Sequence, residues 1–142
     1  MILRPKSPNS PYTEHSSDND MTASFADFAA TQDARNSIQL KIREYSLMLC
    51  DALVLDFETH HPKSDPYKFY IESGRKYHKL IMETNTGSRS VHAFIDKKTG
   101  EVYKPASFKA PAKIVRYNML LIESRQEMFK RADWAGGYLY VR

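Results

Sequence analysis

Residues suited to contacting a polyanion concentrate in residues 90–120, which read SVHAFIDKKTGEVYKPASFKAPAKIVRYNML. Lys109, Lys113 and Arg116 are spaced four and three residues apart. On a helix that begins near residue 110, this spacing would place all three side chains on one side. Free N–H groups at a helix N-terminus attract anions, so cations gathered there suit a bound phosphate. The open alternative is a solvated basic surface without a partner.

Aromatic residues accompany these cations and could stack on unpaired bases. Most aromatic residues between Tyr67 and Phe108 are expected in the core, since strands favour aromatic side chains and a one-sided sheet buries alternate residues. Tyr103 and Phe108 are flanked by lysine and are the two we expect to be exposed. The full set of candidate nucleic-acid-binding residues is Lys97, Lys98, Tyr103, Lys104, Phe108, Lys109, Lys113 and Arg116.

Histidines form the second candidate constellation. If the turn at Asn85-Thr86-Gly87 sets the register, His78 and His92 lie near each other on adjacent strands. Such a pair can bind a metal or relay protons, but no third ligand is evident, so we interpret it as structural. Asp56 and His60, one helical turn apart and followed by His61, are typical of a surface arrangement. We predict no metal and no cofactor.

No catalytic motif is present in the sequence. Cys50, the single cysteine, lies in an apolar run, where the pKa of a thiol rises, and Ser107 lacks the flanking glycines of a nucleophile elbow. A glycine-rich phosphate loop, a paired CxxC and an HExxH motif are all missing. We therefore predict a protein that is not an enzyme.

Charge is distributed unevenly along the 142 residues. Residues 1–61 hold five Lys and Arg against nine Asp and Glu, whereas residues 62–118 hold twelve against five. This asymmetry predicts either attraction between the two halves or a polyanionic partner for the basic half. Without an apolar run long enough for a membrane span or a signal peptide, the sequence predicts a protein of the cytoplasm with no membrane partner.

The first 60 residues are expected to be an arm followed by helices. Residues 1–20 contain three prolines and few large apolar side chains, which is typical of a flexible arm. Helical spacing begins at Thr22, and Asp33 is the predicted N-cap of a second helix that ends before Pro62. The remainder, residues 21–142, is expected to form one domain, helical over residues 22–60.

The second half predicts a sheet. Turn residues separate four runs of strand-forming residues over residues 66–105, which favours an antiparallel meander. In the turn from Asp96 to Gly100, the aspartate can accept a backbone N–H and the glycine can take a positive φ. Pro111 suits the first turn of a helix over residues 110–131, and residues 138–141 suit a short edge strand. The expected fold class is α+β, with N-terminal helices packed on a four- to five-stranded antiparallel sheet and one further helix after Pro111.

The block from residue 94 also resembles a group of small uncharacterised proteins of tailed bacteriophages. The matching pattern is an FIDxxTGxVxKxASxKxPAKxxRxN-like block with a GGYLYVR-like end, which here includes Phe94, Thr99, Gly100, Pro111 and Asn118. The resemblance covers the chain from Tyr77 onward and carries no established activity. Phe108 stands where the group is expected to have tryptophan, and Tyr117 where it is expected to have glycine.

Together these observations predict a phage-type accessory protein that binds nucleic acid through a basic face of the sheet and helix. The alternative is a virion or assembly component whose N-terminal arm docks onto a neighbouring subunit. A third hypothesis is an inhibitor that captures a host protein. The expected location is the host cytoplasm or the virion, with nucleic acid or other phage and host proteins as partners.

Overall fold

The computed structural model describes the backbone of residues 17–140 and the side chains of residues 25–140. Its elements are α1 (Ser17–His60), β1 (Lys68–Ser73), β2 (Tyr77–Glu83), β3 (Arg89–Asp96), β4 (Glu101–Pro105), β5 (Pro111–Asn118), α2 (Ile122–Arg131) and the 3₁₀ helix η1 (Gly137–Leu139). The chain divides into a unit that ends at Ser37 and a larger unit from Ile38 onward, which carries the sheet. The α+β class is confirmed.

A single helix, α1, replaces the two helices expected over residues 22–60. Neither glycine nor proline occurs between residues 12 and 61, so nothing in the sequence interrupts the helix. Asp33, the predicted N-cap, therefore lies inside α1. Of the predicted arm, residues 17–20 belong to α1 and residues 1–16 lie outside the described residues.

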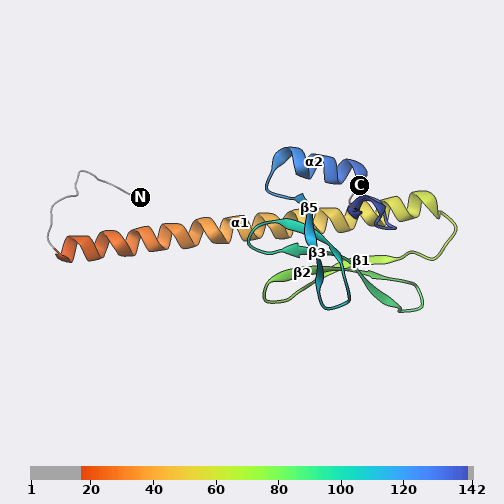
Figure 1. Cartoon of the computed structure of the whole chain (residues 1–142), viewed down its shortest axis with the longest axis horizontal. Helices are drawn as coiled ribbons and strands as arrows, with labels where there is room; N and C mark the ends of the chain where they lie inside the picture. The colour runs from red at the N-terminus through yellow and green to blue at the C-terminus, as the bar shows by residue number, and fades with distance from the viewer. Residues whose placement is uncertain (1–16, 141–142) are drawn as a thin grey trace. The chain divides into compact units, whose positions relative to one another are not determined.

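The five strands form one antiparallel sheet in the order β1-β2-β3-β4-β5 (Figure 1). The turn residues behave as the sequence predicts. Gly87 and Gly100 have φ values of 87° and 77°, and one oxygen of Asp96 accepts the N–H groups of Lys98 (2.8 Å) and Thr99 (3.1 Å). The meander predicted over residues 66–105 is present, and it continues through one further strand.

That further strand is the main correction to the sequence prediction. Residues 111–118, predicted to begin a helix, form β5, and α2 begins only at Ile122. Val102 of β4 pairs with Tyr117, and Glu101 pairs with Asn118. The edge of β4 is therefore paired with β5. The residues around Pro111 suit a helix start and do not predict this pairing. Lys109, Lys113 and Arg116 consequently do not surround a helix N-terminus.

One face of the sheet, the inner face, packs against α1, α2 and the C-terminal segment. Ile42, Leu49 and Leu53 of α1 are fully buried, together with Leu80 and Ile95 of the sheet. Figure 1 shows the part of α1 from Ile38 onward lying next to the sheet, with α2 nearby. Arg125 of α2 lies over the Tyr45 ring of α1, with 4.3 Å between its guanidinium carbon and the ring centroid. The core therefore lies between these helices and the inner face.

The C-terminal segment closes one side of this core. Instead of the predicted strand over residues 138–141, the chain forms η1, in which Tyr138 and Leu139 are buried. The backbone N–H of Trp134 donates to Asp56 of α1 (2.9 Å), and the Trp134 ring meets the Phe57 ring edge-on at 5.1 Å between centroids. These contacts hold the segment against the C-terminal end of α1.

Candidate nucleic-acid interface

The outer face of the sheet carries a row of paired side chains that crosses the whole sheet. Its members face away from the helical core and are Glu72, Lys79, Phe94, Tyr103 and Val115, one from each strand. They share a face because successive residues of a strand alternate sides and directly paired residues share one. The row has two aromatic rings at its centre, of which Phe94 is fully buried and Tyr103 half-buried, and it has a cation in its second position.

Phe108 extends this row from the loop between β4 and β5. Its ring is 42% exposed, and its centroid lies 4.7 Å from Lys79 Nζ and 5.8 Å from the Arg89 guanidinium carbon. Lys79 and Arg89 flank the Ile81–Val91 pair of the outer face. The loop therefore folds back over the sheet and presents an aromatic ring beside two cations.

Tyr103 contributes less exposed surface than the sequence predicts. It is half-buried, and its hydroxyl donates to Glu101 (3.0 Å). Burial, with help from the Glu101 carboxylate, raises the pKa of Tyr103 to about 12, so the ring stays neutral and protonated. Tyr103 and Phe94 both lie within edge-on contact of Tyr77, at 6.2 and 5.6 Å between centroids. Phe108 is the more exposed of the two predicted stacking residues.

Basic residues lie at both ends of the strands that carry the outer face. At one end the β1–β2 and β3–β4 turns meet, since the N–H of Lys97 donates to the carbonyl of Lys76 (3.0 Å). Lys98 is exposed in the same group, and Lys76 Nζ lies 5.4 Å from the Tyr77 centroid. At the other end Lys109 is exposed beside Phe108. We call Lys76, Lys79, Arg89, Lys97, Lys98 and Lys109 the basic track.

Few of these charges are neutralised within the domain. Of the twelve lysines and arginines in residues 62–118, Arg89 alone forms an ion pair with a carboxylate of the described side chains, residues 25–140; its partner is Glu72. The nearby carboxylates have other partners: Glu83 accepts from the Tyr70 hydroxyl, Asp96 from the turn backbone, and Glu101 from Tyr103. The basic track therefore presents a net positive surface to solvent.

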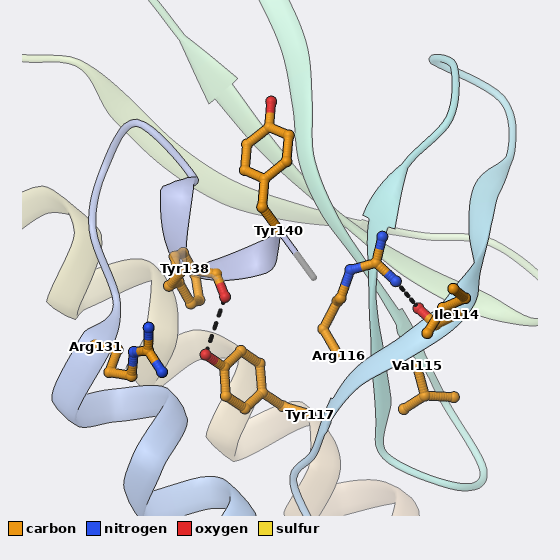
Figure 2. Close-up of a pocket in the computed structure, with 7 residues that line it drawn as sticks. All are labelled: Ile114, Val115, Arg116, Tyr117, Arg131, Tyr138 and Tyr140. Atoms are coloured by element: carbon orange, nitrogen blue, oxygen red, sulfur yellow. Dashed lines mark hydrogen bonds between the residues drawn. The ribbon is translucent and has the colours of Figure 1, made fainter. Parts of the chain in front are cut away.

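Arg116 and Lys104 lie on the other side of the sheet, away from the track. Arg116 is the extra residue of a bulge in β5, and it donates to the carbonyls of Leu139 and Ile114. Figure 2 shows it in a pocket of about 300 Å³ beside Tyr117, whose hydroxyl bonds the Tyr138 carbonyl (2.9 Å). These bonds give Arg116 a structural role. Lys113 is exposed on β5, an edge strand of the sheet.

Lys104 approaches the C-terminal segment instead. Its Nζ lies 4.9 Å from the Tyr140 centroid, within a second pocket of about 310 Å³. The eight candidate residues therefore divide. Phe108 and Tyr103 lie on the outer face, and Lys98 and Lys109 are exposed at its two ends. The Lys97 ammonium donates to the Gly74 carbonyl (2.9 Å) near His78, Lys113 lies on the edge strand, and Lys104 and Arg116 lie on the other side. In the sequence Lys79 and Arg89 are only part of the positive charge of residues 62–118, because their position beside Phe108 depends on the folded loop.

The two strand histidines are not paired, contrary to the predicted register. His78 pairs with Ile95, and His92 is the extra residue of a β-bulge between the Leu80–Ala93 and Ile81–Val91 pairs. His78 Nδ1 bonds Ser73 Oγ (2.7 Å), and His92 Nε2 bonds the Tyr138 hydroxyl (2.9 Å). Burial lowers the pKa of each to about 4, so both are neutral near pH 7.

Other reactive groups are engaged or buried. The Asp56 carboxylate lies 3.3 Å from His60 Nδ1 and also accepts the Trp134 N–H, while burial raises the pKa of Cys50 to about 12. Among the described residues, no three His, Cys, Asp or Glu side chains converge in a way that could hold a metal. Nor does any helix of that part of the chain have the length and hydropathy to cross a membrane.

The fold and surface define an α+β domain built on a five-stranded antiparallel meander with a basic and aromatic outer face. Over residues 25–141 the chain matches a family of unknown function (DUF7717), and it belongs to that family. Neither a curated protein nor a solved structure matches the chain.

Proposed function

We propose that the outer face of the sheet binds single-stranded nucleic acid and that the protein is not an enzyme. The observation that carries this proposal is the exposed Phe108 ring beside Lys79 and Arg89. Proteins that bind single strands combine aromatic rings, on which bases stack, with cations that follow the phosphate backbone. Phe108 would supply the stacking surface and the basic track would supply the phosphate contacts.

The elongated shape of the basic track favours a nucleic-acid strand over a single small anion as the ligand. The track begins at Lys76, Lys97 and Lys98, passes Lys79 in the middle of the sheet, and ends at Arg89 and Lys109. Because its cations are spread along the strands, they suit a chain of phosphates. A strand crossing the face would meet Phe108 near the end of the track.

Fluorescence anisotropy with labelled single- and double-stranded oligonucleotides, across a series of salt concentrations, tests the proposal. The variant Lys76→Gln/Lys79→Gln/Lys109→Gln removes three cations from the track. For single strands each lost phosphate contact lowers the slope of log affinity against log salt by about 0.7, so the slope should fall by about 2. The control Lys41→Gln/Lys63→Gln/Lys130→Gln makes the same change of net charge elsewhere, and its slope should equal that of the wild type.

Absence of binding at low salt would refute the proposal, and so would equal slopes for the two triple variants. Tighter binding of the duplex than of the single strand would refute the stacking role of Phe108. The phage origin suggested by the resemblance stays a prediction, which sequencing of the surrounding genome would test.

A second candidate function, a virion or assembly component, is favoured by one observation on α1. Phe25 and Phe28 are 80% and 61% exposed, which is unusual for large apolar side chains in a monomer. They would pack against a neighbouring subunit. Mass spectrometry of purified particles tests this role, and absence of the protein from the particles would exclude it.

A further inference from the structure

The second pocket, which contains Lys104 and lies on the side of the sheet away from the basic track, has the size and lining of a small-molecule site. Its volume of about 310 Å³ is at the lower end of the range for ligand pockets. The apolar lining includes Trp134 and Tyr140, and the polar lining includes Ser90, His92 and Lys104. Two aromatic rings and a cation in one pocket favour a ligand that is flat in one part and anionic in another.

His92 supplies the observation that points to a bound partner. Its side chain is 8% exposed, and its described hydrogen bond uses Nε2 alone, to the hydroxyl of Tyr138. When the Tyr138 hydroxyl donates to Nε2, the ring proton lies on Nδ1; in the other tautomer Nε2–H donates and Nδ1 carries a lone pair. In both tautomers Nδ1 is a buried polar atom without a described partner, which is costly unless a ligand or water fills the position.

Gly136 leaves the space that such a partner would occupy. It lines the same pocket and has a φ of 86°. A Cβ at this position would lie 3.7 Å from His92 Cε1 and 3.9 Å from Nδ1. The absence of a side chain at Gly136 therefore leaves the Nδ1 edge of the imidazole open to a ligand atom.

We propose that this pocket binds a nucleotide. Trp134 and Tyr140 would contact the base, His92 Nδ1 would form a hydrogen bond with the base or ribose, and the Lys104 ammonium would pair with the phosphate. Ser90, exposed at the rim, adds a hydroxyl. The nucleotide could be free or could be the phosphorylated end of a strand. The inference rests on the pocket lining alone and does not require the basic track to bind a strand.

Trp134 is the single tryptophan of the chain, so its intrinsic fluorescence reports directly on the pocket. Adenosine 5′-monophosphate should quench it saturably, with a dissociation constant below about 1 mM. Adenosine, which lacks the phosphate, should bind roughly tenfold more weakly, since a charge-assisted bond is lost. Free tryptophan amide at the same nucleotide concentrations corrects for absorption of the exciting light.

Lys104→Met should weaken binding of the monophosphate by about tenfold, whereas Lys98→Met, which removes an exposed lysine from a distant turn, should have no effect. Ser90→Ala is a milder rim variant and should weaken binding by about threefold. Circular dichroism establishes that each variant is folded. Failure of the monophosphate to quench saturably, adenosine binding as tight as the monophosphate, or equal losses in Lys104→Met and Lys98→Met would each overturn the proposal.

Competition separates the two sources of the nucleotide. Displacement of the monophosphate by a 5′-phosphorylated oligonucleotide, but not by its unphosphorylated counterpart, would identify a strand end. Lack of displacement by both would identify a free nucleotide, and either result keeps the assigned chemistry. Phe108→Ala should leave the quenching unchanged even if it abolishes oligonucleotide binding, so the failure of one site is distinguishable from the failure of the other.

Discussion

The ammonium group of Lys79 lies 4.7 Å from the centroid of the Phe108 ring. Lys79 belongs to the second strand and Phe108 to the loop between the fourth and fifth strands, so only the folded loop brings them together. A cation near an aromatic ring is stabilised by the quadrupole of that ring. The same arrangement offers a base a stacking surface next to a charge that a phosphate would neutralise.

Phe108→Ala should weaken binding of single-stranded oligonucleotides by roughly 1–3 kcal/mol, or about five- to over a hundredfold, because one stacking contact is lost. Phe108→Trp should retain the affinity. Phe25→Ala, which removes an aromatic ring that is 80% exposed on α1, is the matched control and should bind like the wild type. Anisotropy titration at low salt measures all three, and equal affinity of Phe108→Ala and wild type would contradict the assignment.

Burial along α1 predicts that two leucines two positions apart contribute very different amounts to the free energy of unfolding. Leu53 is fully buried in the core, so Leu53→Ala should lower the free energy of unfolding by about 2–5 kcal/mol. Leu55 is 65% exposed, and Leu55→Ala should change the free energy of unfolding by less than about 0.5 kcal/mol. Urea denaturation followed by circular dichroism measures both. Similar losses in the two variants would show that the face of α1 assigned to the core is wrong.

The two buried histidines should make stability depend on pH. Because the pKa of His78 and His92 falls from 6.5 in the unfolded chain to about 4 in the folded one, the unfolded chain binds more protons between these values. Stability is therefore lost as the pH falls from about 6.5 to about 4. Between about pH 7 and about pH 4.5 each histidine should contribute a loss of roughly 2–3 kcal/mol.

Urea unfolding at several pH values measures this loss. Each of the variants His78→Gln and His92→Gln should show a shallower pH dependence than the wild type over the same range, even if its stability near neutral pH is lower. Carboxylates that titrate in the acid range are common to all three proteins and cancel in the comparison. An identical pH dependence in wild type and variants would contradict the neutral, buried state of the histidines.

The bond between Asp56 and the Trp134 backbone predicts a role in anchoring the C-terminal segment. Asp56→Ala leaves the Trp134 N–H without its acceptor, so the free energy of unfolding should fall by about 1–3 kcal/mol. Trp134 fluorescence should also shift toward that of exposed tryptophan. Glu58→Ala, at an exposed position on the same helix, is the control and should change neither quantity. An unshifted spectrum in Asp56→Ala would show that other contacts suffice to hold the segment.

The strands predicted from the sequence are present because the residues of each turn favour the backbone conformation that the turn requires. Gly87 and Gly100 take the positive φ that their positions require, and Asp96 caps its turn through backbone N–H groups three residues away or fewer. Such interactions are local, so they can be read from neighbouring residues. The helical character of residues 22–60 is equally local, although Asp33 alone was insufficient to begin a second helix.

Non-local pairing explains the parts that were predicted wrongly. Residues 111–118 carry a proline suited to a helix start, yet they form a strand because the free edge of β4 binds them. The register of His78 and His92 depends on a bulge in β3 that turn spacing does not reveal. Once β5 is a strand, Arg116 donates to the Leu139 carbonyl of the C-terminal segment and cannot join Lys109 on a helix.

The sequence by itself determined the α+β class, the turns of the meander and the excess of positive charge in residues 62–118, since each depends on composition or on neighbouring residues. The tertiary structure alone decided which charges share a surface. Phe108 meets Lys79 and Arg89 because a loop folds over the sheet, and His92 meets Tyr138 and Gly136 because the last residues of the chain return to the inner face. Both candidate sites arise from contacts between residues distant in sequence, which no local pattern encodes.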